Sequence, residues 1–256
     1  MRPSAQEKTK RIRPLKPGTS IGHVNITAGT LGFPLYKDDE VYIASNAHVF
    51  VDNPFLPPKK IIERRIVQPG RYDGGDPARD VVAEYVWHQK IWDVWEWGEK
   101  CPITRTIDRL YKLLGRTSRV LGVEENHIDF AVAKALVDVE EKTFSGLPEE
   151  NMFFVGLIFA GSSYGHGVFC KVIKYWPSVL SGFTIPWTFE KDVVAGDKVV
   201  KDGRTTCYNE SAVWITSANV VVSYGAEGVA WFRDVALTEE GFVEPGDSGS
   251  PVFVVG

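Results

Sequence analysis

Short apolar segments separated by polar or glycine-rich turns run through most of the chain, and this pattern predicts antiparallel strands. The strands expected in the first half lie at residues 20–23 and 28–33, in the β-rich run 41–50, and at 81–87 and 127–133. A charged turn at 37–40 would join two of them as a hairpin, and the turn-rich residues 67–77 would form a loop.

The second half of the chain continues the pattern. Nearly continuous apolar runs at 151–160 and 168–173 flank the glycine-rich residues 161–167, which predicts a strand, a turn and a strand. Further short strands are expected at 199–206, 212–215, 220–224 and 229–232. This spacing is typical of a β-barrel, so the sequence predicts an all-β fold.

One segment, residues 88 to about 122, departs from the strand pattern and is interpreted as an insertion with one helix. Within 104–116, apolar side chains recur at helical spacing at Ile107, Leu110, Tyr111 and Leu114. Thr106 is the expected helix cap and Gly115 the expected stop.

A tryptophan cluster precedes this helix at Trp92, Trp95 and Trp97. We interpret it as the small core of the insertion, and recognition of a peptide or partner is the alternative.

Composition describes an ordinary globular protein. The chain has 256 residues, 44% hydrophobic and 24% charged, with no apolar run near the ~18 residues of a membrane helix. A net charge of −4 gives no reason to expect nucleic acid as a partner, and no membrane association is expected.

The N-terminal residues 1–19 form a basic arm, expected to be mobile or to lie on the surface. Residues 1–16 lack an apolar core, so they do not resemble a secretory signal. A cytoplasmic location is therefore expected, or the virion or host cell if the source is viral.

Cysteine and histidine usage predicts neither a disulfide framework nor a metal site. Cys101, Cys170 and Cys207 have no paired spacing, which favours buried thiols. The remaining histidines, apart from His48, show no metal-ligand spacing, so no metal and no cofactor is expected.

Candidate chemistry centres on the turn at residues 244–251. Small residues around Ser248 suit a strained nucleophile turn, in which the backbone N–H groups of Gly246 and Ser248 would form an oxyanion hole. His48 follows a β-rich run, and Asp129 opens an alternating apolar strand. The chain order His48, Asp129, Ser248 is that of chymotrypsin-like enzymes.

Two rivals for these places are present. Asp80 also opens a valine-rich strand and competes with Asp129, which is preferred because the residues that follow it are small and apolar. Ser250 is a weaker candidate nucleophile than Ser248, because only Ser248 has glycine or aspartate on both sides.

At these residues the chain resembles the trypsin-like, chymotrypsin-fold serine peptidases, and its short strings resemble a prokaryotic and viral group. The strings are Ser-Ile-Gly-His, Ala-Gly-Thr-Leu-Gly, Ser-Asn-x-His-Val, Gln-Pro-Gly-x-Tyr-Asp-Gly-Gly, Gly-Arg-Thr-Thr and Gly-Asp-Ser-Gly-Ser. The resemblance implies two antiparallel six-stranded β-barrels. The first would span 20–140, with the helical insertion at about 88–122, and carry His48 and Asp129. The second would span 141–256 and carry Ser248.

The resemblance also suggests roles for the residues before Ser248. In secreted relatives, the aspartate equivalent to Asp247 pairs with a freshly cut N-terminal amine. No apolar N-terminus follows a basic cleavage site here, so we expect the site to be preformed or switched by a partner. Phe242, six positions before Ser248, would lie at the floor of a shallow or apolar specificity pocket, and Glu244 is the alternative.

The sequence departs from the family after Ser248, because it ends at Gly256 whereas relatives continue for several strands. Either the sequence is truncated, leaving 251–255 as an unpaired strand, or other residues supply the missing strands. Residues 154–163 resemble the segment that relatives carry after the serine, so we expect a rearranged second barrel in which they close the pocket. Cys207 stands where relatives tend to have glycine.

The function expected from this sequence is a serine endopeptidase acting on polypeptide substrates through a Ser-His-Asp triad. One alternative is an inactive trypsin-like fold that serves as a peptide-binding or scaffold module. Another is an esterase-type acyl hydrolase using the same triad. The sequence determines neither the cleavage specificity nor the oligomeric state.

Overall fold

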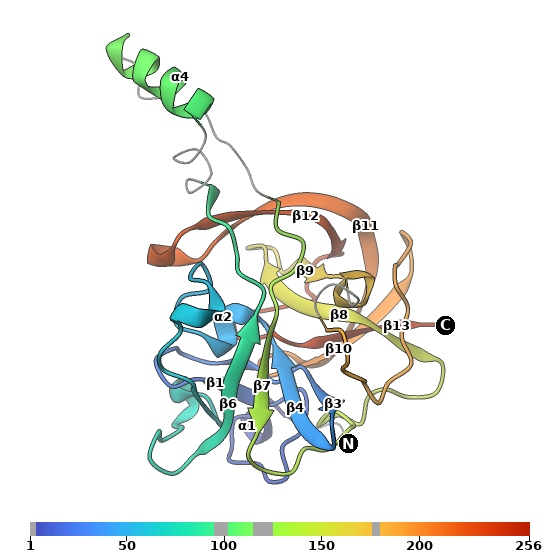
Figure 1. The fold of residues 1–256 in the computed structure, drawn as a ribbon. Coiled ribbons are helices and arrows are strands. Elements are labelled where there is room, and N and C mark those ends of the chain that lie inside the picture. The colour runs from blue at the N-terminus through green and yellow to red at the C-terminus, as the bar shows by residue number, and fades with distance from the viewer. Residues whose placement is uncertain (1–3, 95–101, 115–124, 176–179) are drawn as a thin grey trace.

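The computed structural model describes residues 4–94, 102–114, 125–175 and 180–256. It consists mainly of antiparallel strands in two units, which confirms the predicted all-β, chymotrypsin-like architecture. Figure 1 shows the two units packed together, with helix α4 (Pro102–Leu113) projecting away from both.

The first unit is a seven-stranded antiparallel sheet, where a closed six-stranded barrel was expected. Its strands, in spatial order, are β2 (Gly29–Thr30), β1 (Ser20–His23), β5 (Arg65–Val67), β6 (Val81–His88), β7 (Ala131–Ala135), β4 (Glu40–Ser45) and β3 (Phe33–Lys37).

The additional strand arises because the apolar run 28–33 is divided at Leu31 and Gly32. The part before this point pairs with β1 at one edge of the sheet, and the part after it pairs with β4 at the opposite edge. Because three peptide steps span at most about 11 Å, the two edges must lie close together. The sheet therefore curls into a half-barrel.

The charged turn expected at 37–40 is confirmed as the link between β3 and β4. Lys37 pairs with Glu40, and the two residues between them, Asp38 and Asp39, have φ of 51° and 60°. Two positive φ angles are what a two-residue hairpin turn requires, and aspartate tolerates them better than most residues.

The second unit is a closed six-stranded barrel. Its strands, in spatial order, are β10 (Lys198–Gly203), β11 (Cys207–Ser223), β12 (Val229–Thr238), β9 (Gly167–Cys170), β8 (Met152–Gly161) and β13 (Pro251–Val255). β13 pairs with both β8 and β10, so it is not an unpaired edge. The expectation that residues 154–163 join this barrel is confirmed.

One long strand, β11, replaces the two short strands expected at 212–215 and 220–224. Its pairing with β12 shifts register between Val213 and Val220. Irregularities of this kind bend and twist a strand, so the chain follows the barrel wall without a turn.

The remaining elements are short, apart from α4. They are α1 (Ala5–Lys8), α2 (Ala47–Phe50), η1 (Pro58–Lys60), η2 (Arg71–Asp73), η3 (Val172–Tyr175) and η4 (Gly225–Glu227).

The predicted helix is present as α4, which spans Pro102–Leu113. Thr106 therefore lies inside the helix and is not its cap. Leu110 and Leu113 on this helix are exposed. The expected helix stop, Gly115, lies outside the described residues, as do Trp95 and Trp97 of the expected tryptophan cluster.

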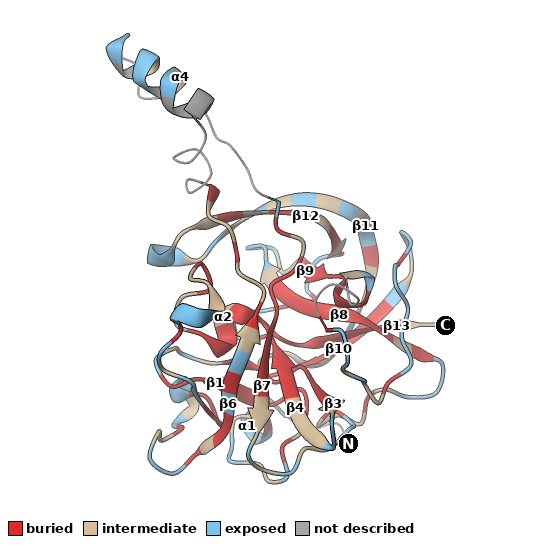
Figure 2. Ribbon diagram, viewed as in Figure 1, coloured by how far each residue is buried: buried red, intermediate tan, exposed pale blue. Residues whose placement is uncertain are grey.

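The largest cluster of buried apolar side chains joins the two units. Phe33 and Phe130 from the first sheet face Phe154 and Phe253 from the barrel, and the rings of Phe33 and Phe154 have centroids 4.7 Å apart. Figure 2 shows buried residues along the strands of both units. The shared core holds the loops of the two units in one arrangement.

The N-terminal arm was expected to be mobile or to lie on the surface, and the structure shows it packed against the protein. Lys8 and Leu15 are fully buried. The backbone of Leu15 pairs with the residues that follow β7 in the chain. The Leu15 N–H donates to the carbonyl oxygen of Asp138 at 2.8 Å.

Candidate active site

His48 and Asp129 are brought together by the pairing of β4 with β7. His48 lies in α2, directly after β4, and Asp129 lies just before β7. Because Ser45 is the register partner of Ala131, the residues flanking these strands meet at one edge. His48 Nδ1 lies 2.5 Å from Asp129 Oδ2.

The Asp129 carboxylate is fully buried and accepts two further hydrogen bonds. The backbone N–H of Ala47 donates to Oδ1 at 2.6 Å, and the Tyr224 hydroxyl donates to Oδ2 at 2.9 Å. Asn46 also donates from its side-chain amide to the Asp129 carbonyl oxygen at 2.8 Å. These contacts hold the carboxylate in one orientation toward His48.

Tyr224 is a site residue that sequence reasoning missed. It follows β11, and burial together with the Asp129 charge raises the pKa of its hydroxyl well above the usual value, so the group remains a proton donor. Its ring also meets the His48 ring edge-on, with centroids 5.6 Å apart. No spacing or motif in the sequence marks this tyrosine.

Ser248 lies in the same cleft as His48. The cleft has a volume of about 920 Å³ and is lined by residues of both units. In the described part of the chain, no hydrogen bond joins Ser248 Oγ to His48 Nε2. Hydrogen bonds between a nucleophile and its base are often long without substrate and tighten when substrate binds.

The loop that carries Ser248 is tied to the first sheet through Thr30. The Thr30 N–H donates to the Ser248 carbonyl oxygen at 2.7 Å, and its hydroxyl donates to the Gly246 carbonyl oxygen at 2.9 Å. Gly249 has a φ of +95°, and a Cβ atom there would fall on the Thr30 carbonyl oxygen. Only glycine suits this position.

Two backbone N–H groups of this loop donate to no acceptor among the residues that the structure describes. The N–H groups of Asp247, Gly249 and Ser250 donate to protein carbonyl oxygens, whereas those of Gly246 and Ser248 donate to no group in the described chain. Gly246 has a φ of +101°, which turns its peptide in a way that other residues rarely adopt. Unpaired N–H groups beside a serine can stabilise a developing oxyanion.

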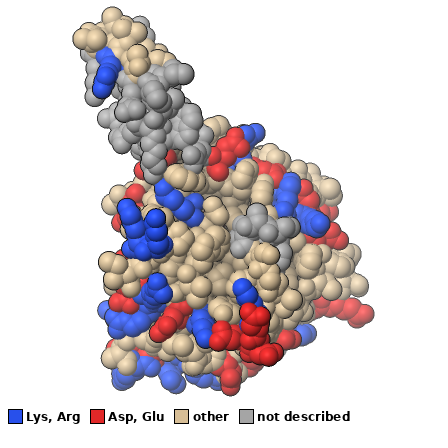
Figure 3. All heavy atoms as spheres, viewed as in Figure 1, with Lys and Arg blue, Asp and Glu red and all other residues tan. Residues whose placement is uncertain are grey.

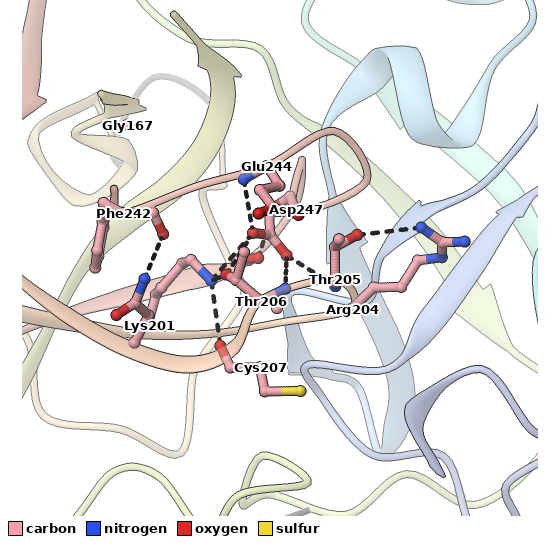
Figure 4. Close-up of polar contacts among 12 residues, drawn as sticks. Gly167, Lys201, Arg204, Thr205, Thr206, Cys207, Phe242, Glu244 and Asp247 are labelled. Carbon is pink, nitrogen blue, oxygen red and sulfur yellow. Dashed lines mark hydrogen bonds and ion pairs between the residues drawn. The ribbon is translucent and has the colours of Figure 1, made fainter. Parts of the chain in front are cut away.

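Asp247, between these two groups, is fully buried beside Lys201. Lys201 Nζ lies 3.2 Å from Asp247 Oδ2, and neither side chain is exposed. Figure 4 shows the lysine reaching from β10 toward the carboxylate. Burial lowers the pKa of Lys201, and the Asp247 charge opposes this shift. Sequence reasoning missed Lys201, because a lysine in a strand is usually exposed.

The Gly-Arg-Thr-Thr turn holds the same carboxylate. The N–H groups of Thr205 and Thr206 donate to Asp247 Oδ1 at 2.9 and 3.1 Å, and the Thr206 hydroxyl donates to Oδ2 at 2.6 Å (Figure 4). Burial alone would raise the pKa of Asp247, but the Lys201 charge and these hydrogen bonds lower it below its ordinary value. These contacts therefore favour the ionised form of the carboxylate.

The turn is also anchored to the first unit, at η2. Arg204 donates from Nε and Nη2 to the two carboxylate oxygens of Asp73, at 2.5 and 2.6 Å. Bidentate arginine–carboxylate pairs fix both partners in distance and orientation. The Ser248 loop is consequently supported from both units.

Asp80 and Ser250, the alternative candidates for the aspartate and the nucleophile, lie outside the cleft. Asp80 accepts hydrogen bonds from Arg11 and from the N–H of Asp76, within the loop before β6. Ser250 is fully buried, and its hydroxyl donates to the Asp247 carbonyl oxygen at 2.5 Å. Neither residue lines the cleft that His48 and Ser248 share.

Phe242 and Glu244, the two residues suggested for the specificity pocket, lie in different environments: the first is in the core and the second lines a cavity. Phe242 is fully buried, and Lys201 Nζ lies 5.7 Å from its ring centroid. Glu244 is exposed at the rim of a cavity of about 110 Å³ next to Ser248. Its other lining residues are Ile158, Ala160, Gly161, Ser162, Val243 and Pro245. Ile158 and residues 160–162, which belong to the segment 154–163, therefore form one wall of this cavity.

Residues 4–94, 102–114, 125–175 and 180–256 contain no cluster of histidine, cysteine or acidic side chains suited to a metal ion, and no helix long and apolar enough to span a membrane. Cys170 is buried and Cys207 is half-buried, both as free thiols, whereas Cys101 lies outside the described residues. Figure 3 shows both signs of charge interspersed over one face.

No described protein family and no curated protein matches the sequence. A solved glutamic-acid-specific serine protease, which utilizes a histidine triad in substrate binding, is similar at 11% identity and a TM-score of 0.39, covering 93% of this chain and 92% of that one. Thermobifida fusca Protease A is similar at 14% identity and a TM-score of 0.41, covering 93% and 76%. Likenesses this distant carry no conclusion about the activity of this chain.

Proposed function

We propose that this protein is a serine endopeptidase, with Ser248 as nucleophile and His48 as general base. The observation that supports this most directly is the buried Asp129–His48 pair, which opens onto the cleft of Ser248 beside the unpaired N–H groups of Gly246 and Ser248. A nucleophile, a base, a group that orients the base and an oxyanion site are the four parts that acyl transfer requires.

In the proposed reaction, Ser248 Oγ forms a bond to the carbonyl carbon of the peptide while His48 Nε2 takes the hydroxyl proton. The carbonyl oxygen becomes negative and accepts hydrogen bonds from the N–H groups of Gly246 and Ser248. When this intermediate collapses, the C–N bond breaks, and His48 gives its proton to the leaving amine. An acyl-enzyme ester on Ser248 remains.

Water completes the cycle. His48 takes a proton from a water molecule whose oxygen attacks the ester carbon, and the same oxyanion site receives the second negative oxygen. The C–Oγ bond then breaks, the acid product leaves, and Ser248 regains its proton from His48. Asp129 remains ionised throughout and stabilises the charged imidazole.

The shape of the cleft favours a polypeptide substrate over a small ester. At about 920 Å³, it lies at the upper end of the range for ligand sites and is lined by both units, so several residues of an extended chain fit beside Ser248. This supports cleavage within a chain.

The test is labelling of the full chain by a fluorophosphonate probe, which reacts with an activated serine. We expect labelling of the native protein, its loss in Ser248→Ala and His48→Ala, and its strong reduction in Asp129→Asn. Asp80→Asn is the matched control, because Asp80 opens a strand in the same way as Asp129 but lies outside the cleft, and it should label normally.

Hydrolysis assays then separate the candidate functions. Turnover of a peptide library that disappears in Ser248→Ala supports the endopeptidase, and turnover of small esters alone would favour an esterase. Absence of labelling in a correctly folded protein would contradict the proposal and favour a peptide-binding module.

A further inference from the structure

The N-terminal arm inserts one side chain beside the machinery that supports Ser248. Lys8, at the end of α1, is fully buried and forms an ion pair with the fully buried Asp202 at the end of β10. Its Nζ also donates to the carbonyl oxygen of Gly203 at 3.0 Å. Nearly two hundred residues of sequence separate the lysine from both partners, so this is a tertiary contact.

Asp202 and Gly203 lead directly into the turn that holds Asp247. Gly203 packs so closely that a Cβ atom there would fall on the Asp247 carboxylate and on the Ser250 hydroxyl. The next residues, Thr205 and Thr206, donate their N–H groups to Asp247 (Figure 4). The backbone at Gly203 therefore contacts Lys8 on one side, and the turn that follows it contacts the Ser248 loop on the other.

Asp202 is bound on its remaining sides as well. The N–H and hydroxyl of Ser145 donate to its two carboxylate oxygens, both at 2.8 Å. Lys8 is the only cation in the described chain that forms an ion pair with Asp202. Without Lys8, a buried carboxylate would lack a counter-charge next to the turn, and relaxation of the turn is the easiest way to hydrate it.

The rest of the arm is anchored away from this loop. The Ile12 N–H donates to Gln68 Oε1 at 2.9 Å, and the Gln68 amide donates to the Lys10 carbonyl oxygen at 2.8 Å. Near the Ser248 loop, an open cavity of about 500 Å³ lies between Ala5 and Gly246. The contact of the arm with the loop support is thus concentrated in the Lys8 side chain.

We propose that Lys8 is a positioning residue for the Ser248 loop, so that the N-terminal arm must be seated for efficient acyl transfer. This inference rests on the proposed peptidase function. Lys8 touches no reacting atom and acts through Asp202, Gly203 and the turn that follows. This role makes the N-terminal arm a regulatory element, because a protease or partner that removes the arm also removes support from the Ser248 loop.

The test compares Lys8→Met with Lys10→Met in the full chain. Methionine keeps much of the side-chain length and removes the charge, and Lys10 is an exposed lysine on the same arm. We expect Lys8→Met to lower kcat and the rate of probe labelling by at least about tenfold with KM within about twofold, since small misplacements of reacting groups have effects of this size. Lys10→Met should behave as the native chain.

Hydrogen exchange supplies a readout that does not depend on activity. In Lys8→Met, the N–H groups of Gly249 and Ser250 should exchange faster, while those of distant strands stay unchanged. If the native chain hydrolyses nothing, the proposed function fails, and exchange alone decides the role of Lys8. Native labelling and native exchange in Lys8→Met would overturn the inference.

A second variant covers the case in which Lys8→Met fails to fold. Lys8→Met/Asp202→Asn removes the unpaired buried charge, so we expect it to fold and to recover most of the native labelling rate, because the turn no longer has to relax to hydrate Asp202. A folded double variant that remains slow in labelling would contradict the inference, because Lys8 would then not act through the charge of Asp202.

Discussion

The Tyr224 hydroxyl donates to Asp129 Oδ2, the same carboxylate oxygen that His48 approaches, at a distance of 2.9 Å. The first unit supplies the aspartate and the histidine, and the barrel supplies the tyrosine, so this oxygen is a point where the two units meet. Relative movement of the units would disturb the orientation of the base.

Tyr224→Phe should therefore lower kcat without unfolding the protein. A hydrogen bond to a charged group contributes about 1.5–3 kcal/mol, which corresponds to a reaction slower by at least about tenfold. Steady-state kinetics on a peptide substrate measures it. Tyr164→Phe, at an exposed turn tyrosine, is the control. Equal kcat in the two variants would show that the Asp129 orientation does not depend on Tyr224.

Lys201→Met should destabilise the protein strongly and abolish most of the labelling by the probe. Breaking one side of a buried ion pair costs about 3–5 kcal/mol, because Asp247 remains charged without a partner. Urea unfolding measures the loss. Lys198→Met on the same strand is the control, since Lys198 pairs at the surface with Glu210 and should matter little. A loss shared equally by both variants would contradict this role.

Stability at acid pH should reflect the lowered pKa of Asp247. Because the folded pKa lies below the unfolded value near 3.8, the stabilisation is complete above that value and is lost as pH falls through the folded pKa. Between about pH 6 and about pH 3, the unfolding free energy of the native chain should fall further than that of Asp247→Asn. Parallel urea titrations of both proteins measure this, and identical pH slopes would contradict it.

The cavity beside Ser248 should select a small or aliphatic side chain on the amino side of the cleaved bond. Its volume of about 110 Å³ is below the roughly 150 Å³ of an engineered cavity that binds benzene, so an aromatic ring does not fit. We expect kcat/KM for alanine or valine substrates to exceed that for phenylalanine by at least about tenfold. Val243→Ala should narrow this difference by enlarging the cavity. A native preference for phenylalanine would contradict the assignment.

The sequence predicted the parts of the site that depend on local chemistry. His48, Asp129 and Ser248 each stand in a short motif, and glycine at 246 and 249 has φ values that other residues rarely adopt. The structure brings His48 to Asp129 and places Ser248 in their cleft, while the catalytic roles themselves remain a proposal.

The features that could not be predicted from the sequence are those that depend on long-range packing. Lys201 and Lys8 look like ordinary surface lysines in the sequence, and only the tertiary fold shows that each is buried against an aspartate. Phe242 was placed in the pocket by its spacing from Ser248, but the fold turns it into the core. The division of residues 28–33 also depends on strand partners that are distant in sequence.

The position of β13 in the barrel bears on when activity can begin. β13 lies between β8 and β10 and follows every other described strand in the chain. During synthesis, which delivers residues in order, the ring cannot close before Val255 has emerged from the ribosome. The Ser248 loop, immediately before β13, gains its support in the same event. Under the proposed peptidase function, a nascent chain would therefore lack a supported Ser248 loop while it is still being made.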